Sequence, residues 1–278
     1  MVDIIKEHYG DTFQRLRESK ELKQSAFESL GLSRRTILNF EKGEKMLEID
    51  KLDAALAEMN TSLAEFEYLA NDFSLDDYED TFLELEHAYY NGNVKALQEI
   101  EDFYGDKDKQ IALCAKAAYS ALTEKEKKLL ADYIMGVDIW GFYELCILSF
   151  IAEQLSTNML QSIMKDWIRP TTAYQNIFKY RRKMQQVLHR IAAEMCTRGE
   201  QEFALKCLVQ SRRLLFERDT FSRTLHYFVR GYYQWTFKDK EAGDGMMKEA
   251  IHVFEITESN DLLKTYQDYY DKHVKNDS

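Results

Sequence analysis

A single proline, Pro170, and only eleven glycines occur among the 278 residues. An all-β chain of this length would need many tight turns, and these two residue types build most such turns. Long stretches without either residue are instead typical of helices, so the sequence predicts an all-α protein. Apolar side chains make up 45% of the chain, which is enough to bury a core and excludes a disordered chain.

The spacing of apolar residues predicts a bundle of five short helices in residues 1–71. The expected helices contain Tyr9, Phe13 and Leu16, and then cover about residues 23–29, 33–43, 50–59 and 62–70. Ser62, with Glu65 three positions later, predicts a capping box at the start of the fifth helix. The acidic stretch 71–80 is expected to link this bundle to a second domain, residues 72–278.

The third helix of the bundle has the features of a DNA recognition helix. Ser33 is a good N-cap, Ile37 and Phe40 are spaced to face inward, and Gly43 ends the helix. Residues 15–45 hold eight basic and five acidic side chains, a net charge of +3 in a chain whose total is −11. A basic N-terminal half with an apolar back face is what a helix in the major groove requires.

Arginine can donate two hydrogen bonds to guanine or grip a phosphate, and short polar side chains read other base edges. The residues expected to contact double-stranded DNA are Gln24, Ser33, Arg34, Arg35, Thr36, Asn39 and Lys42. The alternative is that two adjacent arginines belong to a solvated helix face. Their coincidence with the cap, the turn at Gly31 and the apolar spacing favours DNA binding.

Beyond residue 80 the pattern becomes a series of helical hairpins, which predicts an α-solenoid. The expected helices cover about residues 78–90, 94–104, 107–122, 124–135, 139–157, 159–168, 171–197, 201–217, 221–238, 241–257 and 259–274. The segment from Gly231 to Phe254 is similar to a degenerate tetratricopeptide unit, so we interpret the hairpins as TPR-like. An irregular helical bundle is the alternative.

The segments Leu22–Gln24, Gly31–Ile37 and Phe40–Glu44 resemble the helix-turn-helix of Cro and the phage repressors. More specifically, four segments are similar to the Rgg/GadR/MutR regulators of Gram-positive bacteria: Phe13–Lys20, Phe40–Glu44, Leu52–Leu56 and Ser62–Phe66. The resemblance covers residues 8–72 well and extends more loosely over the helical remainder.

The resemblance implies several further features. An arginine of the first helix and the glutamate that ends the recognition helix pair as a structural clamp in the repressor fold, and Arg17 and Glu41 occupy these places. In the Rgg-type family the C-terminal repeats form a homodimer and bind a short signalling peptide on their concave face. The chain is therefore expected to be a homodimeric, peptide-sensing transcription regulator.

A peptide groove is compatible with the composition of residues 179–230, which hold twelve basic and five acidic side chains. Arginines can hold the carboxylates of a peptide while aromatic residues contact its apolar side chains. The residues expected to bind the peptide are Trp140, Tyr143, Tyr180, Arg181, Arg212, Tyr227 and Arg230. The alternative is that these aromatic side chains belong to the core.

Other function classes find little support in the sequence. The six histidines form no HxxxH or HExxH pattern, no phosphate-binding loop occurs, and the four cysteines lack metal-ligand spacing. We therefore expect no enzyme activity, no metal and no cofactor. No apolar stretch is long enough to span a membrane and no signal peptide is recognisable, so we expect a cytoplasmic protein.

A TPR-like scaffold for protein interactions, with an N-terminal bundle that does not bind DNA, is the rival hypothesis. The two differ in salt dependence, because contacts with DNA phosphates make binding steeply dependent on salt.

Overall fold

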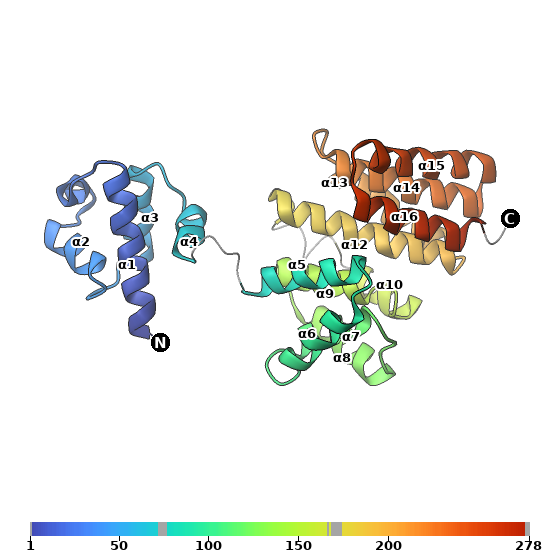
Figure 1. The fold of residues 1–278 in the computed structure, drawn as a ribbon, viewed down its shortest axis with the longest axis horizontal. Coiled ribbons are helices and arrows are strands. Elements are labelled where there is room, and N and C mark those ends of the chain that lie inside the picture. Colours follow the sequence, from blue (N-terminus) through green and yellow to red (C-terminus); the bar gives the residue numbers. More distant parts are fainter. Residues whose placement is uncertain (1, 72–76, 166, 168–173, 276–278) are drawn as a thin grey trace. The chain divides into compact units, whose positions relative to one another are not determined.

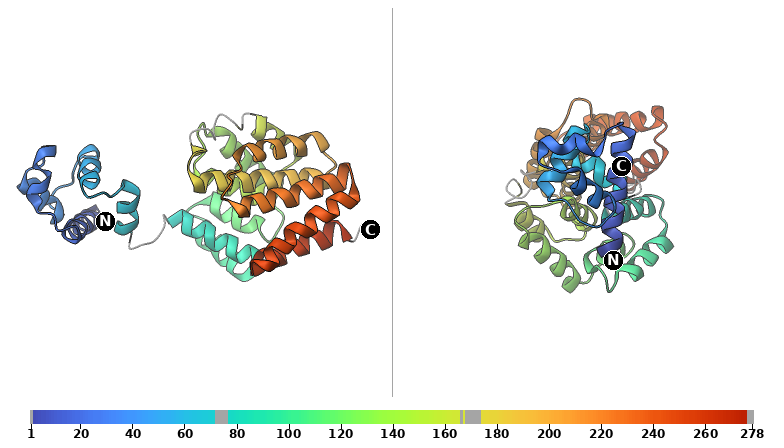
Figure 2. Two further views of the ribbon diagram at one scale, coloured as in Figure 1. Left: turned by 90° about the horizontal axis from the view of Figure 1, so that it is seen from above. Right: turned by 90° about the vertical axis from the view of Figure 1, so that its left-hand side faces the viewer.

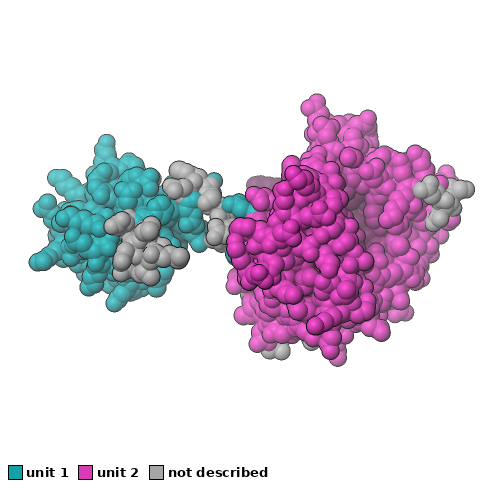
Figure 3. Space-filling model, turned by 60° about the horizontal axis from the view of Figure 1, so that its bottom comes forward, with its two compact units in different colours: residues 1–80 teal, residues 81–278 magenta. Residues whose placement is uncertain are grey.

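The computed structural model describes residues 2–71, 77–165, 167 and 174–275, and in these residues it contains helices and turns but no strand. The all-α fold class is therefore confirmed. The chain divides into two compact units, residues 1–80 and 81–278 (Figure 3). The boundary expected from the sequence is at residue 71, and residues 72–76 of the expected linker lie outside the described residues.

Unit 1 is a small helical bundle (Figure 1). Its elements are α1 (Val2–Ser19), the 3-10 helix η1 (Gln24–Leu30), α2 (Arg34–Glu41), α3 (Ile49–Glu58) and α4 (Leu63–Ala70). Phe13 lies at the centre of the core, 5.6 Å from the ring of Phe27 and 5.3 Å from that of Phe40. The predicted capping box is present, because Ser62 and Glu65 bond each other's backbone N–H groups.

The second helix differs from the expectation because it is a 3-10 helix rather than an α-helix. Its N-cap is Lys23, whose side chain makes no capping bond. Gly31 ends it in the left-handed conformation, with φ +76°. A left-handed residue at this place suits glycine and lets the chain turn directly into α2.

Unit 2 is a series of antiparallel helices (Figures 1 and 2). They are α5 (Asp77–Tyr90), α6 (Val94–Tyr104), α7 (Lys109–Ala117), α8 (Glu124–Gly136), α9 (Phe142–Ile151), α10 (Thr157–Lys165), α12 (Phe178–Thr197), α13 (Gln201–Leu214), α14 (Thr220–Phe237), α15 (Lys240–Ile256) and α16 (Asn260–His273). Consecutive helices pack together from α12 to α16, and α6 packs against α7 and α8 against α9. Helix α12 also packs against α9 and α14.

Three helices of unit 2 are shorter than their apolar patterns predict. The helix expected over 107–122 is α7, which covers only Lys109–Ala117. The helix expected over 139–157 is α9, which ends at Ile151, and residues 152–155 form a turn. The amide of Gln154 in this turn donates to the carbonyl oxygens of Ala117 and Ser120 at 2.7 and 2.8 Å. The turn thus satisfies the end of α7. The helix expected over 171–197 begins only at Phe178, and residues 171–173 lie outside the described part.

Glycines bring α14 and α15 unusually close together. A Cβ atom on Gly243 would lie 2.3 Å from the backbone nitrogen of Trp235 and 2.6 Å from the carbonyl oxygen of Gly231. No real side chain fits at such distances, so the crossing of the two helices requires glycine here. Gly245, two positions later in α15, has nothing within 4 Å of the same point.

We therefore expect Gly243→Ala to destabilise unit 2 by about 1–3 kcal/mol, as overpacking does. Gly245→Ala is the matched control and is expected to be neutral or stabilising, because alanine favours a helix by roughly 0.5–1 kcal/mol over glycine. Thermal melting of both variants checks this. Equal melting temperatures would show that the close crossing does not constrain the fold.

Candidate functional site

The N-terminus of α2 is exposed and polar, whereas the opposite face of the helix is buried. Ser33 caps it, because its hydroxyl accepts a hydrogen bond from the backbone N–H of Thr36 at 3.1 Å and lies 2.9 Å from the Thr36 hydroxyl. Ile37 and Phe40, on the opposite side, are fully buried. Burial of Ile37 and Phe40 therefore fixes the orientation of α2, and its polar residues face the solvent.

Arg34 and Arg35 are exposed at this edge. Within the described part of the chain, neither guanidinium group forms a hydrogen bond or an ion pair. Lys42, at the other end of α2, is exposed, and Asn39 is half-buried between them. Two adjacent cations without acidic partners add positive charge to the positive end of the helix dipole, so this edge is locally positive.

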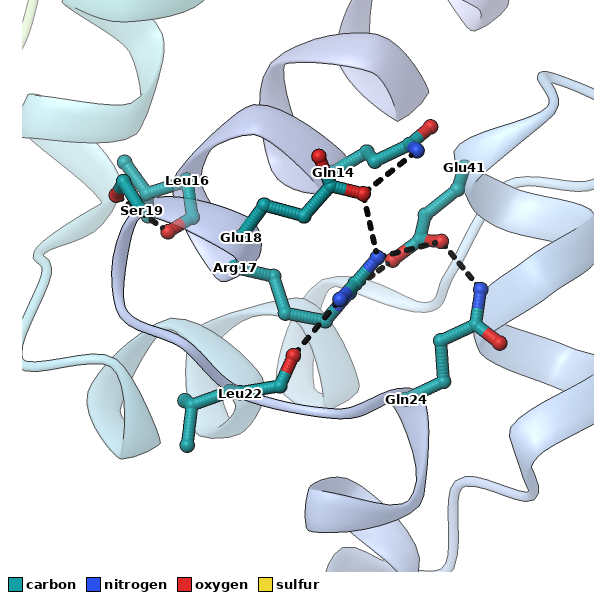
Figure 4. Close-up of polar contacts among 8 residues, drawn as sticks. All are labelled: Gln14, Leu16, Arg17, Glu18, Ser19, Leu22, Gln24 and Glu41. Atoms are coloured by element: carbon teal, nitrogen blue, oxygen red, sulfur yellow. Dashed lines mark hydrogen bonds and ion pairs between the residues drawn. The ribbon is translucent and has the colours of Figure 1, made fainter.

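A buried charge pair joins α1 to the end of α2 (Figure 4). The Nε of Arg17 donates to Oε1 of Glu41 at 2.6 Å and its Nη2 to Oε2 at 3.2 Å. The two side chains are only 8% and 2% exposed. The hydrogen bond with Glu41 raises the pKa of Arg17, so the guanidinium stays charged. We refer to Arg17 and Glu41 as the clamp.

Gln24 is bound to the clamp. Its Nε2 donates to Oε2 of Glu41 at 2.6 Å (Figure 4), and Arg17 also donates to the carbonyl oxygen of Leu22 at 2.7 Å. One N–H of the Gln24 amide is thus engaged in a hydrogen bond within unit 1, and this bond connects the start of η1 to the end of α2. This contact was not expected from the sequence.

Gly10 also positions α2. A Cβ atom at Gly10 would lie 2.2 Å from the carbonyl oxygen of Phe40 and 2.8 Å from that of Glu41. The backbone of α1 therefore touches the C-terminal carbonyl groups of α2. A glycine inside an expected helix is the sequence signal for such a close approach, so Gly10 could have been recognised from the sequence.

Unit 2 contains an inner cavity of about 90 Å³ between α5, α9, α12, α14 and α16. Its lining residues are Tyr89, Tyr90, Ser149, Glu153, Gln186, His189, Arg190, Ala193, Leu225, Phe228, Val229, Thr265, Tyr266 and Tyr269. In a stack of helical hairpins, alternate helices lie on the same side. Helices α9, α12, α14 and α16 alternate with α10, α13 and α15 along the chain, so they form one side of the solenoid. Solenoids bind extended ligands on such a surface.

Arg190 and His189 are two of the polar residues that line the inner cavity. Arg190 donates to the carbonyl oxygen of Ser149 at 2.8 Å and to the hydroxyl of Tyr90 at 3.4 Å. His189 is 4% exposed and its Nε2 lies 2.5 Å from the hydroxyl of Ser211, but its buried Nδ1 has no partner. Burial lowers the pKa of His189 to about 3, so the ring is neutral at pH 7.

A second cavity, of about 460 Å³, lies between α13, α14 and α15. Its lining residues are Arg212, Leu215, Arg223, Thr224, His226, Tyr227, Arg230, Glu249, Ala250 and Val253. We call it the arginine cavity. Three of the residues expected to bind the peptide, Arg212, Tyr227 and Arg230, come together here and not in the inner cavity.

The other four residues expected to bind a peptide have separate places. Trp140 is 2% exposed and its indole N–H donates to the carbonyl oxygen of Ile134 at 3.1 Å, so it belongs to the core. Tyr143 is half-buried and its hydroxyl lies 2.7 Å from the Asp108 carboxylate. Tyr180 stacks on Tyr174 at 4.7 Å, and the Arg181 guanidinium lies 5.0 Å from the Phe216 ring. These contacts do not form one open groove.

The cysteines Cys114, Cys146, Cys196 and Cys207 are buried free thiols. Burial raises the pKa of Cys196 and of Cys207 to about 12, which makes both poor nucleophiles. Among the described helices, none combines the length and the apolar character that a membrane span requires.

The family is decided by unit 2. Residues 81–268 match the sequence model of the family described as HTH-type transcriptional regulator Rgg, C-terminal domain. The chain belongs to the Rgg family. This is a family of transcriptional regulators and not of enzymes.

Solved structures show the same fold. The SHP pheromone receptor Rgg2 of Streptococcus dysgalactiae is 23% identical, with 96% of this chain and 100% of that chain covered and a TM-score of 0.79. A protein of Listeria monocytogenes EGD-e assigned as a transcriptional regulator is 16% identical, with 98% and 99% covered and a TM-score of 0.83. PrgX in its complex with cCF10 is 13% identical, with 94% and 90% covered and a TM-score of 0.68.

The clamp predicts a stability effect confined to unit 1. Glu41→Ala leaves Arg17 buried without its carboxylate, and breaking a buried pair costs about 3–5 kcal/mol. We expect faster hydrogen–deuterium exchange in α1 and α2, with unit 2 unchanged.

The matched control is Glu44→Ala, because Glu44 is an exposed glutamate three positions away. It should leave the exchange of α1 and α2 as in the unmodified protein. Equal protection of these helices in the two variants would contradict the assigned role of the clamp.

Proposed function

We propose that this protein is a sequence-specific DNA-binding transcription regulator that acts as a homodimer in the cytoplasm. The observation that carries the proposal is the N-terminus of α2, where Arg34 and Arg35 are exposed and unpaired on a helix fixed by the clamp. In a helix-turn-helix this edge enters the major groove. Membership of a family of transcriptional regulators supports this assignment.

The proposed roles follow from where each side chain lies. Arg34 and Arg35 donate to guanine or to phosphate oxygens, and Asn39 and Lys42 extend the polar edge along α2. Ser33 and Thr36 cap the helix and so position its exposed end near the backbone of DNA. Gln24, which is bonded to Glu41, sets the position of α2, and its remaining N–H is the group proposed to reach a phosphate.

We further propose that unit 2 binds a short signalling peptide at the inner cavity. Structures with the same fold include a pheromone receptor and a complex with cCF10. The unpartnered Nδ1 of His189 offers a hydrogen bond to a ligand, and a cavity of about 90 Å³ is large enough for one apolar side chain of a peptide. The rest of the peptide would contact the tyrosines that line the inner cavity, Tyr89, Tyr90, Tyr266 and Tyr269.

Homodimerisation rests on the family and on the preference of soluble proteins for twofold symmetry. A dimer would place two copies of α2 on the half-sites of a pseudo-palindrome. A peptide regulates such a dimer only if it binds one arrangement of the two DNA-binding units better than another. Coupling of about 1–3 kcal/mol is typical of such regulation.

Selection of bound sequences from a pool of random duplex DNA, at two salt concentrations, tests the main proposal. We expect a motif with twofold symmetry and a steep loss of affinity with salt. Arg34→Ala and Arg35→Ala should each weaken binding to the selected duplex by about 1–3 kcal/mol, the value of one specific base contact. Arg218→Ala, which removes an exposed arginine of unit 2, is the control and should bind as tightly as the unmodified protein.

A scaffold without DNA affinity is the outcome that would contradict this proposal. It would give no enriched sequence at either salt concentration, with or without an added cytoplasmic extract that supplies the ligand. Equal affinities of all the variants for an enriched duplex would retain DNA binding but remove Arg34 and Arg35 from the interface.

The peptide site is tested by filling the inner cavity. Peptides of eight residues, selected from a synthetic random library for binding to the unmodified protein, should bind Ala193→Phe at least about tenfold more weakly, a loss of about 1.4 kcal/mol. Ala242→Phe is the control, because Ala242 is exposed on α15 and does not line the cavity. Equal affinities for the two variants would place the peptide elsewhere.

A further inference from the structure

The arginine cavity lies on the side of α14 opposite the inner cavity. Successive residues of an α-helix are separated by 100°, so Leu225, Phe228 and Val229, which line the inner cavity, point away from Arg223, Tyr227 and Arg230. A ligand in the arginine cavity would therefore occupy a different surface from the proposed peptide.

Three cations of this cavity have no acidic partner. Arg212, Arg223 and Arg230 are exposed, and within the described residues none of them forms an ion pair or a hydrogen bond. Neighbouring arginines of the same unit do pair, as Arg182 does with Asp219 at 2.9 Å and Arg198 with Glu194 at 2.7 Å. In a chain with 48 acidic residues, three arginines that line one cavity without an ion pair make this surface locally positive.

The other titratable groups of the cavity do not neutralise this charge. Glu249 supplies one carboxylate, which accepts a hydrogen bond from the Tyr227 hydroxyl at 2.7 Å, and three arginines therefore still leave a net charge of about +2. His226 is 7% exposed, and its Nδ1 lies 3.2 Å from the Ser211 hydroxyl. Burial, followed by the positive charges of Arg230, Arg212 and Arg223, lowers the pKa of His226 to about 4. The ring is neutral at pH 7, and all three arginines lie close enough to act on it.

The remaining walls fit the organic part of a small molecule. Leu215, Ala250 and Val253 are apolar, and the Arg230 guanidinium lies over the Tyr227 ring at 5.4 Å. A volume of about 460 Å³ is within the usual range for small-molecule sites. Guanidinium groups bind phosphate oxygens through two parallel hydrogen bonds.

From this arrangement we infer that the arginine cavity is a binding site for a small molecule that carries two or more phosphate charges. The three arginines hold the phosphates, and the apolar wall and Tyr227 contact the organic body. Glu249 then faces a hydroxyl or amino group of the ligand, because a carboxylate next to a phosphate would be repelled. The inference does not depend on the proposed binding of DNA or peptide.

Calorimetric titration of the full chain with pyrophosphate and with ATP, at constant ionic strength and without DNA, tests the site. Pyrophosphate probes the phosphates alone, and ATP adds a base and a sugar. We expect saturable binding of at least one probe to the unmodified protein, and at least about tenfold weaker binding, equal to about 1.4 kcal/mol, to the triple variant Arg212→Gln, Arg223→Gln, Arg230→Gln. A tighter complex with ATP would identify a nucleotide-like ligand, whereas equal affinities would indicate that the phosphates alone are recognised.

The matched control is the double variant Arg213→Gln, Arg218→Gln, which removes two exposed arginines from the same region but outside the cavity. It should retain the affinity of the unmodified protein. Circular dichroism and thermal melting establish that each variant is folded.

Two results would overturn the inference. One is equal affinity of the unmodified protein, the triple variant and the double variant, which would indicate nonspecific attraction. The other is no binding of either probe to the unmodified protein. If, in that second case, the triple variant also bound the selected duplex more weakly, the three arginines would be contacts for the DNA backbone.

Discussion

A charge pair removed from water determines how unit 1 can present α2. Arg17 and Glu41 are nearly inaccessible to solvent, and each charge is tolerated there only because the other lies beside it. Their separation by 24 residues means that α1 and the end of α2 must meet before either charge can be buried. Gln24 adds η1 to the same point. The exposed end of α2 is thus held by an interaction at its opposite, buried end, and Arg34 and Arg35 take no part in holding the helix in place.

In unit 2 the corresponding constraint is steric. Gly231 and Gly243 let α14 and α15 approach until backbone touches backbone. Because α14 also packs on α12, its position is fixed on both sides. Asp219 anchors its N-terminus, since the carboxylate accepts bonds from Ser222 and from Arg182 on α12. Burial opposes ionisation of Asp219, but these bonds outweigh it and lower the pKa. The position of α14, the helix between the two cavities, is therefore fixed by contacts with α12 and α15 and at its N-terminus.

The sequence was sufficient to place most of the helices along the chain, but not to predict the 3-10 form of η1 or the surfaces that could bind a ligand. Apolar spacing and caps such as Ser33 and Ser62 depend on residues three or four positions apart. A short stretch of sequence is therefore enough to predict them. Convergence of Arg212, Tyr227 and Arg230 is also partly local, because two of them lie on one turn of α14. By contrast, Arg190 and the tyrosines of the inner cavity come from helices far apart along the chain. No spacing rule distinguishes such aromatic residues from core residues. For the same reason Trp140 was expected to bind the peptide, whereas the structure shows the alternative, a buried core residue.

The buried Ser211 hydroxyl lies between His189, on the inner cavity, and His226, on the arginine cavity. A hydroxyl carries one hydrogen, so it can donate to only one of these neutral rings, and the other ring must donate to it. If Ser211 donates to His189, the Nδ1 of His189 carries a hydrogen and the Nε2 of His226 is bare. If Ser211 donates to His226, both assignments are reversed. A ligand atom that accepts a hydrogen bond from Nδ1 of His189 in the inner cavity therefore also fixes the tautomer of His226 at the arginine cavity. The Ser211 hydroxyl in this way couples the protonated ring nitrogens of the two histidines.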